Sequence, residues 1–143
     1  MKQLFNNIYV AGQITANDFP ELAEAGIKVI INNRPDNEEP GQFSAAQAQE
    51  LAEKHGISYH YLPMANGQPL PENLVEDFKS IVNATDEPIL THCRSGMRSS
   101  FIWALGQIAD GKVSVDQAVE SAQNAGIPLS NARAVLELSL IHI

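Results

Sequence analysis

Short apolar runs alternate with amphipathic stretches along this chain. The short apolar runs at 8–10, 27–31, 57–62 and 89–92 predict strands, and the run at 27–31 is rich in β-branched residues. Polar capping residues and closing glycines predict helices at 15–25, 44–55, 71–83, 98–109, 114–126 and from 130 onward. Strands separated by helices need crossover connections. We therefore expect an α/β fold with a mainly parallel central sheet of about four strands flanked by helices.

Length and charge narrow the function classes. The 143 residues favour one domain over residues 1–143. We expect a cytoplasmic protein, since the N-terminus lacks the apolar core of a signal peptide and no run approaches the roughly 20 apolar residues of a membrane span. Acidic residues outnumber basic ones by 17 to 9, for a formal charge of −8. Such a surface disfavours nucleic acids and anionic membranes as partners, while the oligomeric state stays open.

The only cysteine, Cys93, lies between an expected strand and an expected helix. A single thiol excludes an internal disulfide and a two-cysteine redox relay within the chain. His92 precedes it, and Arg94 and Arg98 follow within five residues. Backbone N–H groups of such a loop form an anion cradle, and the helix N-terminus adds partial positive charge. These surroundings stabilise a thiolate, so we expect Cys93 to act as a nucleophile on a small anionic or phosphorylated substrate.

A metal or other cofactor is not expected. His55, His60 and His142 lie far apart in the sequence and lack the spacing of metal ligands. Loops 33–42, 63–70 and 93–98 follow three of the predicted strands and are expected at one edge of the sheet, where ligands bind in open α/β folds. Arg34 and Asp36 in the first of these loops are candidates to reach over the Cys93 loop.

The segment from His92 to Ser100 resembles the phosphate-binding loop of cysteine-dependent tyrosine and dual-specificity phosphatases. Residues from about 7 to 109 further resemble a bacterial family, the beta-lactamase hydrolase-like protein phosphatase-like domain, and segments 31–42 and 61–64 carry that similarity. The resemblance implies a cysteine-phosphatase-like fold and hydrolysis of phosphate monoesters.

The same resemblance implies roles for individual residues. Cys93 attacks phosphorus and forms a thiophosphate intermediate. Arg98 and the loop amides hold the non-bridging oxygens. His92 braces the loop, and Ser99 or Ser100 donates a hydrogen bond to the sulfur. The residues expected to line the anion site are Arg94, Ser95, Gly96, Met97 and Ser100.

Two departures from the phosphatase pattern keep other functions open. Four residues separate Cys93 from Arg98, where the phosphatases have five, and the shorter loop resembles that of rhodaneses, which carry a persulfide. Asn66 stands where the general acid is expected and cannot donate a proton as a carboxylic acid does. Asp36 is the first replacement, with Glu38 or Glu39 next. A sulfurtransferase or persulfide carrier, and a module that binds phosphorylated ligands, are therefore the alternatives to hydrolysis.

Overall fold

The computed structural model describes residues 1–141, and it confirms the predicted α/β class. Its sheet has five strands in the order β1-β2-β5-β3-β4. The strands are β1 (Lys2–Phe5), β2 (Ile8–Ala11), β3 (Val29–Asn32), β4 (Ser58–Tyr61) and β5 (Ile89–His92). Strands β2, β5, β3 and β4 run parallel to one another, as expected, whereas β1 pairs antiparallel with β2. Strand β1 was not predicted because Leu4 is its only buried residue.

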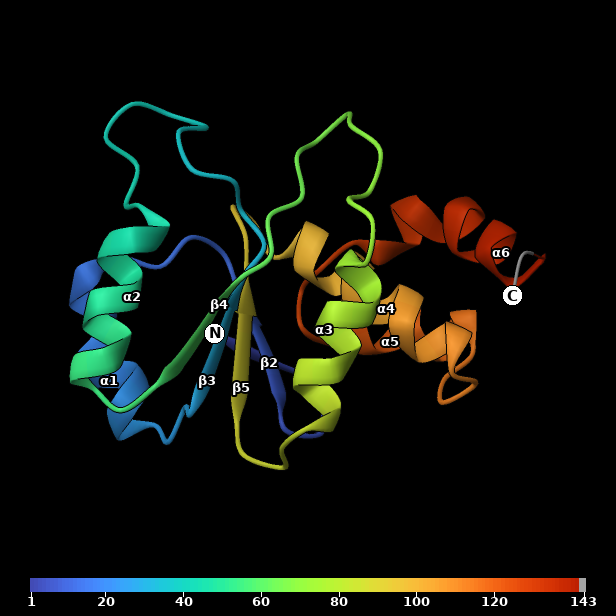
Figure 1. The fold of residues 1–143 in the computed structure, drawn as a ribbon. Coiled ribbons are helices and arrows are strands. Elements are labelled where there is room, and N and C mark those ends of the chain that lie inside the picture. The colour runs from blue at the N-terminus through green and yellow to red at the C-terminus, as the bar shows by residue number, and fades with distance from the viewer. Residues whose placement is uncertain (142–143) are drawn as a thin grey trace.

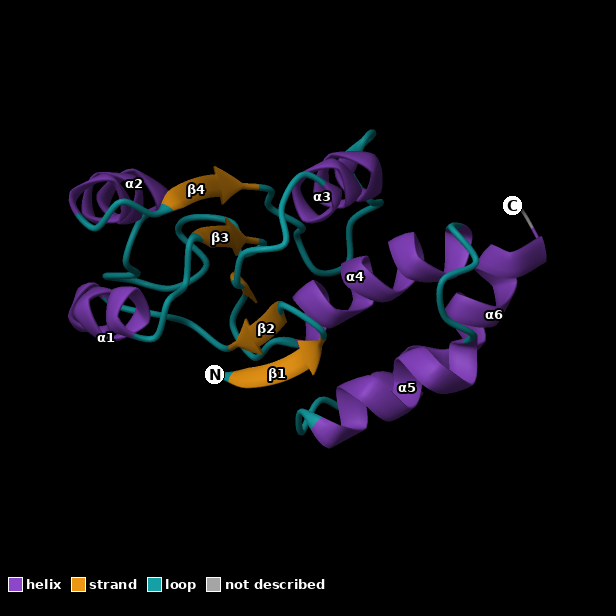
Figure 2. Cartoon of the chain, turned by 90° about the horizontal axis from the view of Figure 1, so that it is seen from below, coloured by secondary structure: helices purple, strands orange, loops and turns teal. Residues whose placement is uncertain are grey.

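Helices cover both faces of the sheet, as Figures 1 and 2 show: α1 and α2 lie on one side, and α3 to α6 lie on the other. The α-helices are α1 (Phe19–Glu24), α2 (Ala45–Lys54), α3 (Leu74–Asn83), α4 (Met97–Ala109), α5 (Val115–Asn124) and α6 (Arg133–Ile141), with short 3-10 turns at Ala16–Asp18 and Leu129–Ala132. No helix within residues 1–141 is both long and apolar enough to cross a membrane.

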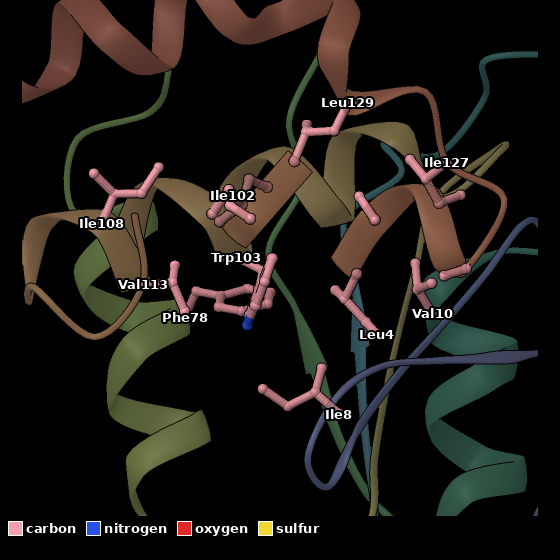
Figure 3. Close-up of a cluster of buried hydrophobic side chains, with 14 of the residues drawn as sticks. Leu4, Ile8, Val10, Phe78, Ile102, Trp103, Ile108, Val113, Ile127 and Leu129 are labelled. Carbon is pink, nitrogen blue, oxygen red and sulfur yellow. The ribbon is translucent and has the colours of Figure 1, made fainter. Parts of the chain in front are cut away.

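Alternating side chains of the central strands feed two hydrophobic clusters. Ile30 and Leu90 face α1 and α2, where they pack with Phe19 and other buried residues. Ile31 and Ile89 point to the opposite face and join the larger cluster under α3, α4 and α5. Figure 3 shows part of this second cluster, with Leu4, Ile8, Phe78, Trp103 and Leu129 among its labelled members. Burial on both faces explains why the central strands read as continuous apolar runs in the sequence.

The register of β3 and β5 brings two chain segments to the same level. Asn32 pairs with His92 at the carboxyl ends of these strands, so Asn33 and Cys93 are the next residues on each side. The N–H of Asn33 donates a hydrogen bond of 2.8 Å to the carbonyl oxygen of His92. The loops after β3 and β4 rise from this same edge in Figure 1. The expected meeting of loops at one edge of the sheet is thereby confirmed.

Candidate active site

The loop from Cys93 to Gly96 joins β5 to α4 and closes tightly around the thiol. Gly96, at the N-terminus of α4, has a φ of 94°, a conformation that residues with a Cβ rarely adopt. A Cβ here would also lie 2.8 Å from Cδ1 of Ile127. The Gly96 N–H donates a hydrogen bond of 3.1 Å to Sγ of Cys93. A backbone donor therefore points at the sulfur from the start of α4, where the helix dipole also favours negative charge.

Arg98, in the first turn of α4, presents its guanidinium beside this loop. Its Nη1 donates to Oε2 of Glu38 at 2.8 Å and to the carbonyl oxygen of Met64 at 2.9 Å, and its Nη2 donates to Oε1 of Glu38 at 2.9 Å. The hydrogen bonds to Glu38 raise the pKa of Arg98, and the neighbouring Cys93 acts in the same direction against the opposing effect of burial. Arg98 is therefore a fixed cation whose position is set by the loops after β3 and β4.

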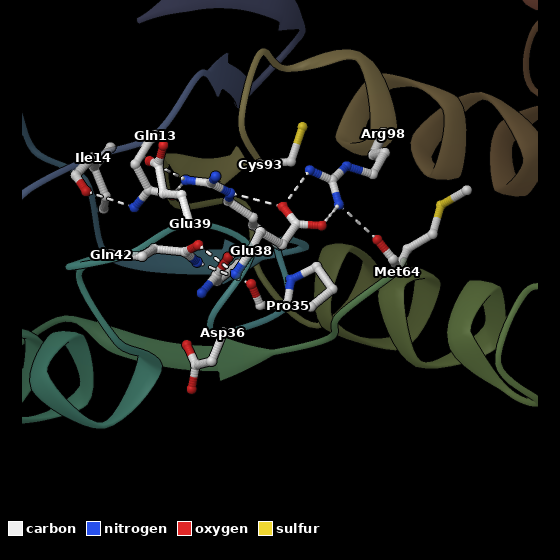
Figure 4. A network of polar contacts seen from close by, with 12 residues as sticks. Gln13, Ile14, Pro35, Asp36, Glu38, Glu39, Gln42, Met64, Cys93 and Arg98 are labelled. Atoms are coloured by element: carbon white, nitrogen blue, oxygen red, sulfur yellow. Dashed lines mark hydrogen bonds and ion pairs between the residues drawn. The ribbon is translucent and has the colours of Figure 1, made fainter. Parts of the chain in front are cut away.

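Glu38 receives a second guanidinium as well. Nε of Arg34 donates to its Oε1 at 2.8 Å, so the two arginines converge on one carboxylate, as Figure 4 shows for Arg98. The hydrogen bond from Arg98 makes the largest contribution in lowering the pKa of Glu38 to about 2, and Arg34 adds to it, although partial burial opposes the shift. Glu38 is therefore a carboxylate at neutral pH.

Arg34 itself is almost completely buried, at 1% exposure. Its Nη1 donates to Oε1 of Gln13 at 2.9 Å and lies 3.3 Å from Oε1 of Glu39, and its backbone N–H donates to Oδ1 of Asn32. Its Nη2 is buried and has no hydrogen-bond partner within residues 1–141. A buried guanidinium with an unused donor is unusual, because buried polar groups are normally hydrogen-bonded.

The side chain of Asn33 links the end of β3 to the strand and the helix on either side of the cysteine loop. Its Oδ1 accepts hydrogen bonds from the hydroxyls of Thr91, at 2.8 Å, and Ser99, at 2.7 Å. Its Nδ2 donates to the carbonyl oxygen of Leu62 at 2.9 Å. One buried amide thus ties together β5, α4 and the segment after β4.

His92 lies under the loop with 1% of its surface exposed. Burial lowers the pKa of its imidazole to about 4, and the positive charge of Arg34 acts in the same direction. The side chain is therefore neutral at pH 7. It lies at the end of β5, directly before Cys93, and the bracing role inferred from the sequence stays a prediction.

Several of the expected site residues do not meet the thiol. The carboxylate of Asp36 accepts a hydrogen bond of 2.9 Å from the N–H of Ala45 at the start of α2, and Figure 4 shows it directed away from Cys93. Asn66 lies exposed in the loop after β4. The hydroxyl of Ser99 is bound to Asn33 instead of the sulfur. The expected contacts of Asp36 and Ser99 with the thiol are therefore corrected, because Ala45 holds the first side chain and Asn33 the second.

The other loop residues divide between surface and interior. Arg94 and Ser95 are exposed, and Met97 is half-buried. Arg94 instead contributes its carbonyl oxygen, which accepts a hydrogen bond of 3.1 Å from the N–H of Gln13. Ser100 is buried, and its hydroxyl has no hydrogen-bond partner in the described part of the chain.

Two contributors were missed by reasoning from the sequence. Gln13 follows β2 and supports Arg34, and the carbonyl oxygen of Met64 supports Arg98. A backbone carbonyl carries no sequence signal, and Gln13 lies 80 residues before Cys93, so no motif connects them. Among residues 1–141 no three His, Cys, Asp or Glu side chains are grouped as metal ligands; His142 lies outside the described residues.

Comparison with known proteins gives a family match and a fold match. Residues 1–110 match the family model of the beta-lactamase hydrolase-like protein, phosphatase-like domain. A beta-lactamase hydrolase-like protein of Agrobacterium fabrum is 33% identical over 128 residues, which cover 90% of this chain and 30% of that protein. The chain thus spans less than a third of the length of the curated relatives it matches.

Among solved structures, a candidate phosphatase from Neisseria meningitidis Z2491 superimposes with a TM-score of 0.86 and 34% identity, and the match covers 96% of each chain. The core catalytic domain of a PP-IP phosphatase from S. cerevisiae superimposes with a TM-score of 0.69 at 19% identity, covering 96% of this chain and 83% of that one. At that identity the second likeness concerns the fold alone.

Proposed function

The chain belongs to the phosphatase-like domain family of the beta-lactamase hydrolase-like proteins, and on this basis we propose that it hydrolyses phosphate monoesters through a covalent intermediate on Cys93. The observation that carries the proposal is that Cys93, at the start of the loop after β5, lies beside Arg98 in the first turn of α4. The sulfur accepts the Gly96 N–H, and the guanidinium of Arg98 is held beside it. A nucleophile next to a fixed cation and a helix N-terminus suits attack on an anionic phosphoryl group.

The proposed reaction has two steps. The Cys93 thiolate attacks phosphorus, a sulfur–phosphorus bond forms, and the phosphorus–oxygen bond to the leaving group breaks with its electron pair. Water then attacks the thiophosphate, which releases inorganic phosphate and returns the thiolate. Arg98 and the loop N–H groups stabilise the charge that develops on the non-bridging oxygens, and a guanidinium can do so with two parallel hydrogen bonds.

The groups around the thiol restrict the leaving group. Asp36 is held at α2, and Glu38 is a carboxylate bound by two guanidiniums, so neither is placed and protonated to serve as a general acid in this arrangement. Leaving groups that are stable as anions, such as aryl oxides, need no protonation. We therefore expect aryl phosphates to be cleaved much faster than alkyl phosphates.

Sulfur transfer is the second candidate, and the spacing of four residues between Cys93 and Arg98 favours it. In that reaction the Cys93 thiolate attacks the outer sulfur of thiosulfate, a sulfur–sulfur bond forms, and sulfite leaves with the electron pair of the bond that breaks. The resulting persulfide passes its terminal sulfur to an acceptor such as cyanide, which becomes thiocyanate. No step requires a general acid, in keeping with the positions of Asp36 and Asn66.

Two parallel assays separate these candidates. The wild-type protein and Cys93→Ser are incubated with p-nitrophenyl phosphate and, separately, with thiosulfate plus cyanide, and intact mass is measured during turnover. Phosphate release that depends on Cys93, with a gain of one phosphoryl group in mass, supports hydrolysis. Thiocyanate formation with a gain of one sulfur atom supports sulfur transfer instead.

Two other outcomes would contradict the proposed mechanism. Phosphate release that persists in Cys93→Ser would remove Cys93 from the mechanism. If neither reaction proceeds but phosphopeptides bind to the wild-type protein, the chain is a binding module.

A further inference from the structure

The thiol is closed off from solvent in this structure. Cys93 has 0% of its surface exposed, and Arg98 only 6%. A phosphorus or sulfur atom of a substrate has to come within bonding distance of Sγ, and it cannot do so while the site is covered. Some part of the cover must therefore move before any chemistry on Cys93.

The side chain of Glu38 is bound to Arg98, the guanidinium that lies beside this thiol. Its two carboxylate oxygens accept three hydrogen bonds of 2.8–2.9 Å from the guanidiniums of Arg34 and Arg98. Two oxygens held by a guanidinium fork are the contacts that arginine makes with a bound carboxylate or phosphate ligand. Glu38 therefore occupies donors that an anionic substrate would use.

Two roles for Glu38 are consistent with these contacts. It either orients Arg98 for a substrate that binds beside it, or it is an internal anion that the substrate must replace. Complete burial of Cys93 favours the second role, because a substrate bound beside Glu38 would need open space at the sulfur. The buried and unpartnered Nη2 of Arg34 favours it as well, since Glu38 leaves this donor without a partner and an anion with more oxygens offers it an acceptor.

The loop that carries Glu38 is braced by its own side chains, while Asp36 anchors its start to Tyr61 and Ala45. The Glu38 N–H donates to Oε1 of Gln42, and Nε2 of Gln42 donates to the carbonyl oxygen of Pro35, both at 2.9 Å. Both bonds join residues of the segment 35–42 to one another and not to the sheet. Asn37 and Gly41 have φ angles of 64° and 73°, which mark the turns of this segment.

We propose that Glu38 acts as an internal anion that keeps the Cys93 site closed, and that the site opens to dianions, which replace the Glu38 carboxylate between Arg34 and Arg98. The proposal rests on the proposed function insofar as Arg98 binds the substrate's anionic group, but it holds for hydrolysis and for sulfur transfer alike. Phosphate monoesters above a pH of about 6 and thiosulfate are both dianions.

Charge explains why a dianion is required. A tethered carboxylate acts at an effective concentration on the order of millimolar or higher, so a free monoanion at lower concentration does not displace it. The second negative charge of a dianion adds to its Coulomb attraction to the two guanidiniums, and solvent screens this attraction little in a buried site. Its extra oxygens also offer acceptors for the unused Nη2 donor of Arg34.

The test compares Glu38→Gln with the wild-type protein. Glu39→Gln is the matched control. Among the described residues, Glu39 makes only a 3.3 Å contact to Arg34 and none to Arg98. Sulfate binding is measured by calorimetry, and Cys93 alkylation by iodoacetamide is followed by intact mass. We expect Glu38→Gln to bind sulfate and to react with iodoacetamide at least about tenfold better than wild type, and Glu39→Gln to change each by less than about twofold. Acetate is expected to bind the wild-type protein at least about tenfold more weakly than sulfate.

Weaker sulfate binding in Glu38→Gln would overturn the proposal and assign Glu38 the role of orienting Arg98; unchanged binding, or equal affinities for acetate and sulfate, would overturn it too. A second measurement uses only the wild-type protein, in case the variant does not fold. Saturating sulfate should speed amide hydrogen exchange within 35–42, and slower or unchanged exchange contradicts displacement of the loop. None of these readouts is turnover, so failure of the proposed function is recognised separately, in the assays with p-nitrophenyl phosphate and thiosulfate.

Discussion

The hydroxyl of Ser99 donates a hydrogen bond of 2.7 Å to Oδ1 of Asn33, which lies 66 residues earlier in the chain. Both side chains are completely buried. This contact fixes the first turn of α4 to the end of β3, and through it sets the position of Arg98 one residue away. The geometry of the candidate site therefore depends on a polar contact inside the core as well as on the cysteine loop.

Replacing Asn33 is expected to destabilise the fold strongly. Asn33→Ala leaves the buried hydroxyls of Thr91 and Ser99 and the carbonyl oxygen of Leu62 without their partner, which costs on the order of 3 kcal/mol. Ser99→Ala is the control, because it removes one of these bonds and is expected to cost about 1 kcal/mol. Urea unfolding measures both, and equal losses in the two variants would contradict the central place of Asn33.

Arg98→Lys is expected to reduce turnover far more than stability. An ammonium group cannot form the paired hydrogen bonds that the guanidinium makes, so stabilisation of the transition state falls and kcat drops by about 10²-fold or more. Turnover is measured with whichever substrate is active, and the fold is checked by circular dichroism. Equal turnover in a folded variant would exclude Arg98 as the group that holds the substrate anion.

The Glu38 ion pairs should make the protein sensitive to acid. The pKa of Glu38 is lowered from 4.5 to about 2 in the fold, so the unfolded chain takes up its proton first as the pH falls. This stabilisation is fully present above a pH of about 5 and is lost towards pH 2. Because Glu38 is partly solvated, we expect wild type to lose about 1 kcal/mol more than Glu38→Gln between pH 6 and pH 3.5. Parallel pH profiles of unfolding free energy for the two proteins would contradict this.

Protonation of His92 should reduce the stability of the fold at a higher pH than protonation of Glu38 does. Its pKa falls from 6.5 to about 4 on folding, so the unfolded chain binds a proton below pH 6.5 that the folded chain does not accept. Wild type should therefore lose on the order of 2 kcal/mol between pH 7 and pH 5, and His92→Gln should show a flatter profile. His60→Gln serves as the control, because His60 is only partly buried and its pKa is lowered less. A wild-type slope retained in His92→Gln would assign the effect to another group.

Gly96→Ala tests the backbone of the cysteine loop. Its φ of 94° disfavours a side chain, and the added Cβ would meet Cδ1 of Ile127 at 2.8 Å. Gly26→Ala is matched, with a φ of 89° and no atom within 4 Å, and should cost roughly 1 kcal/mol. We expect Gly96→Ala to cost at least about 1 kcal/mol more, by thermal unfolding, and to lose turnover because the N–H that points at Sγ shifts. Equal costs for the two glycines would mean that the loop adapts freely.

The sequence by itself determined the α/β class, the four parallel strands and the place of the cysteine loop between a strand and a helix. Each of these is encoded locally: apolar runs form the strands, Ser44 and Ser114 begin helices through capping boxes, and Cys93, Gly96 and Arg98 lie within six residues of one another. The two departures from the phosphatase pattern, Asn66 in place of a general acid and the four-residue spacing between Cys93 and Arg98, were also evident from the sequence alone.

Only the tertiary structure decided which distant groups support Arg98 and the elements that flank the cysteine loop. Asp36 and Glu38 are two residues apart, yet one carboxylate caps α2 and the other joins two arginines, because backbone direction in the loop sends them to opposite sides. Asn33, Gln13 and the carbonyl oxygen of Met64 contribute through strand register and loop path, which no local pattern encodes. Hydrogen bonds across long separations depend on atoms meeting in space, and that meeting is a property of the folded chain.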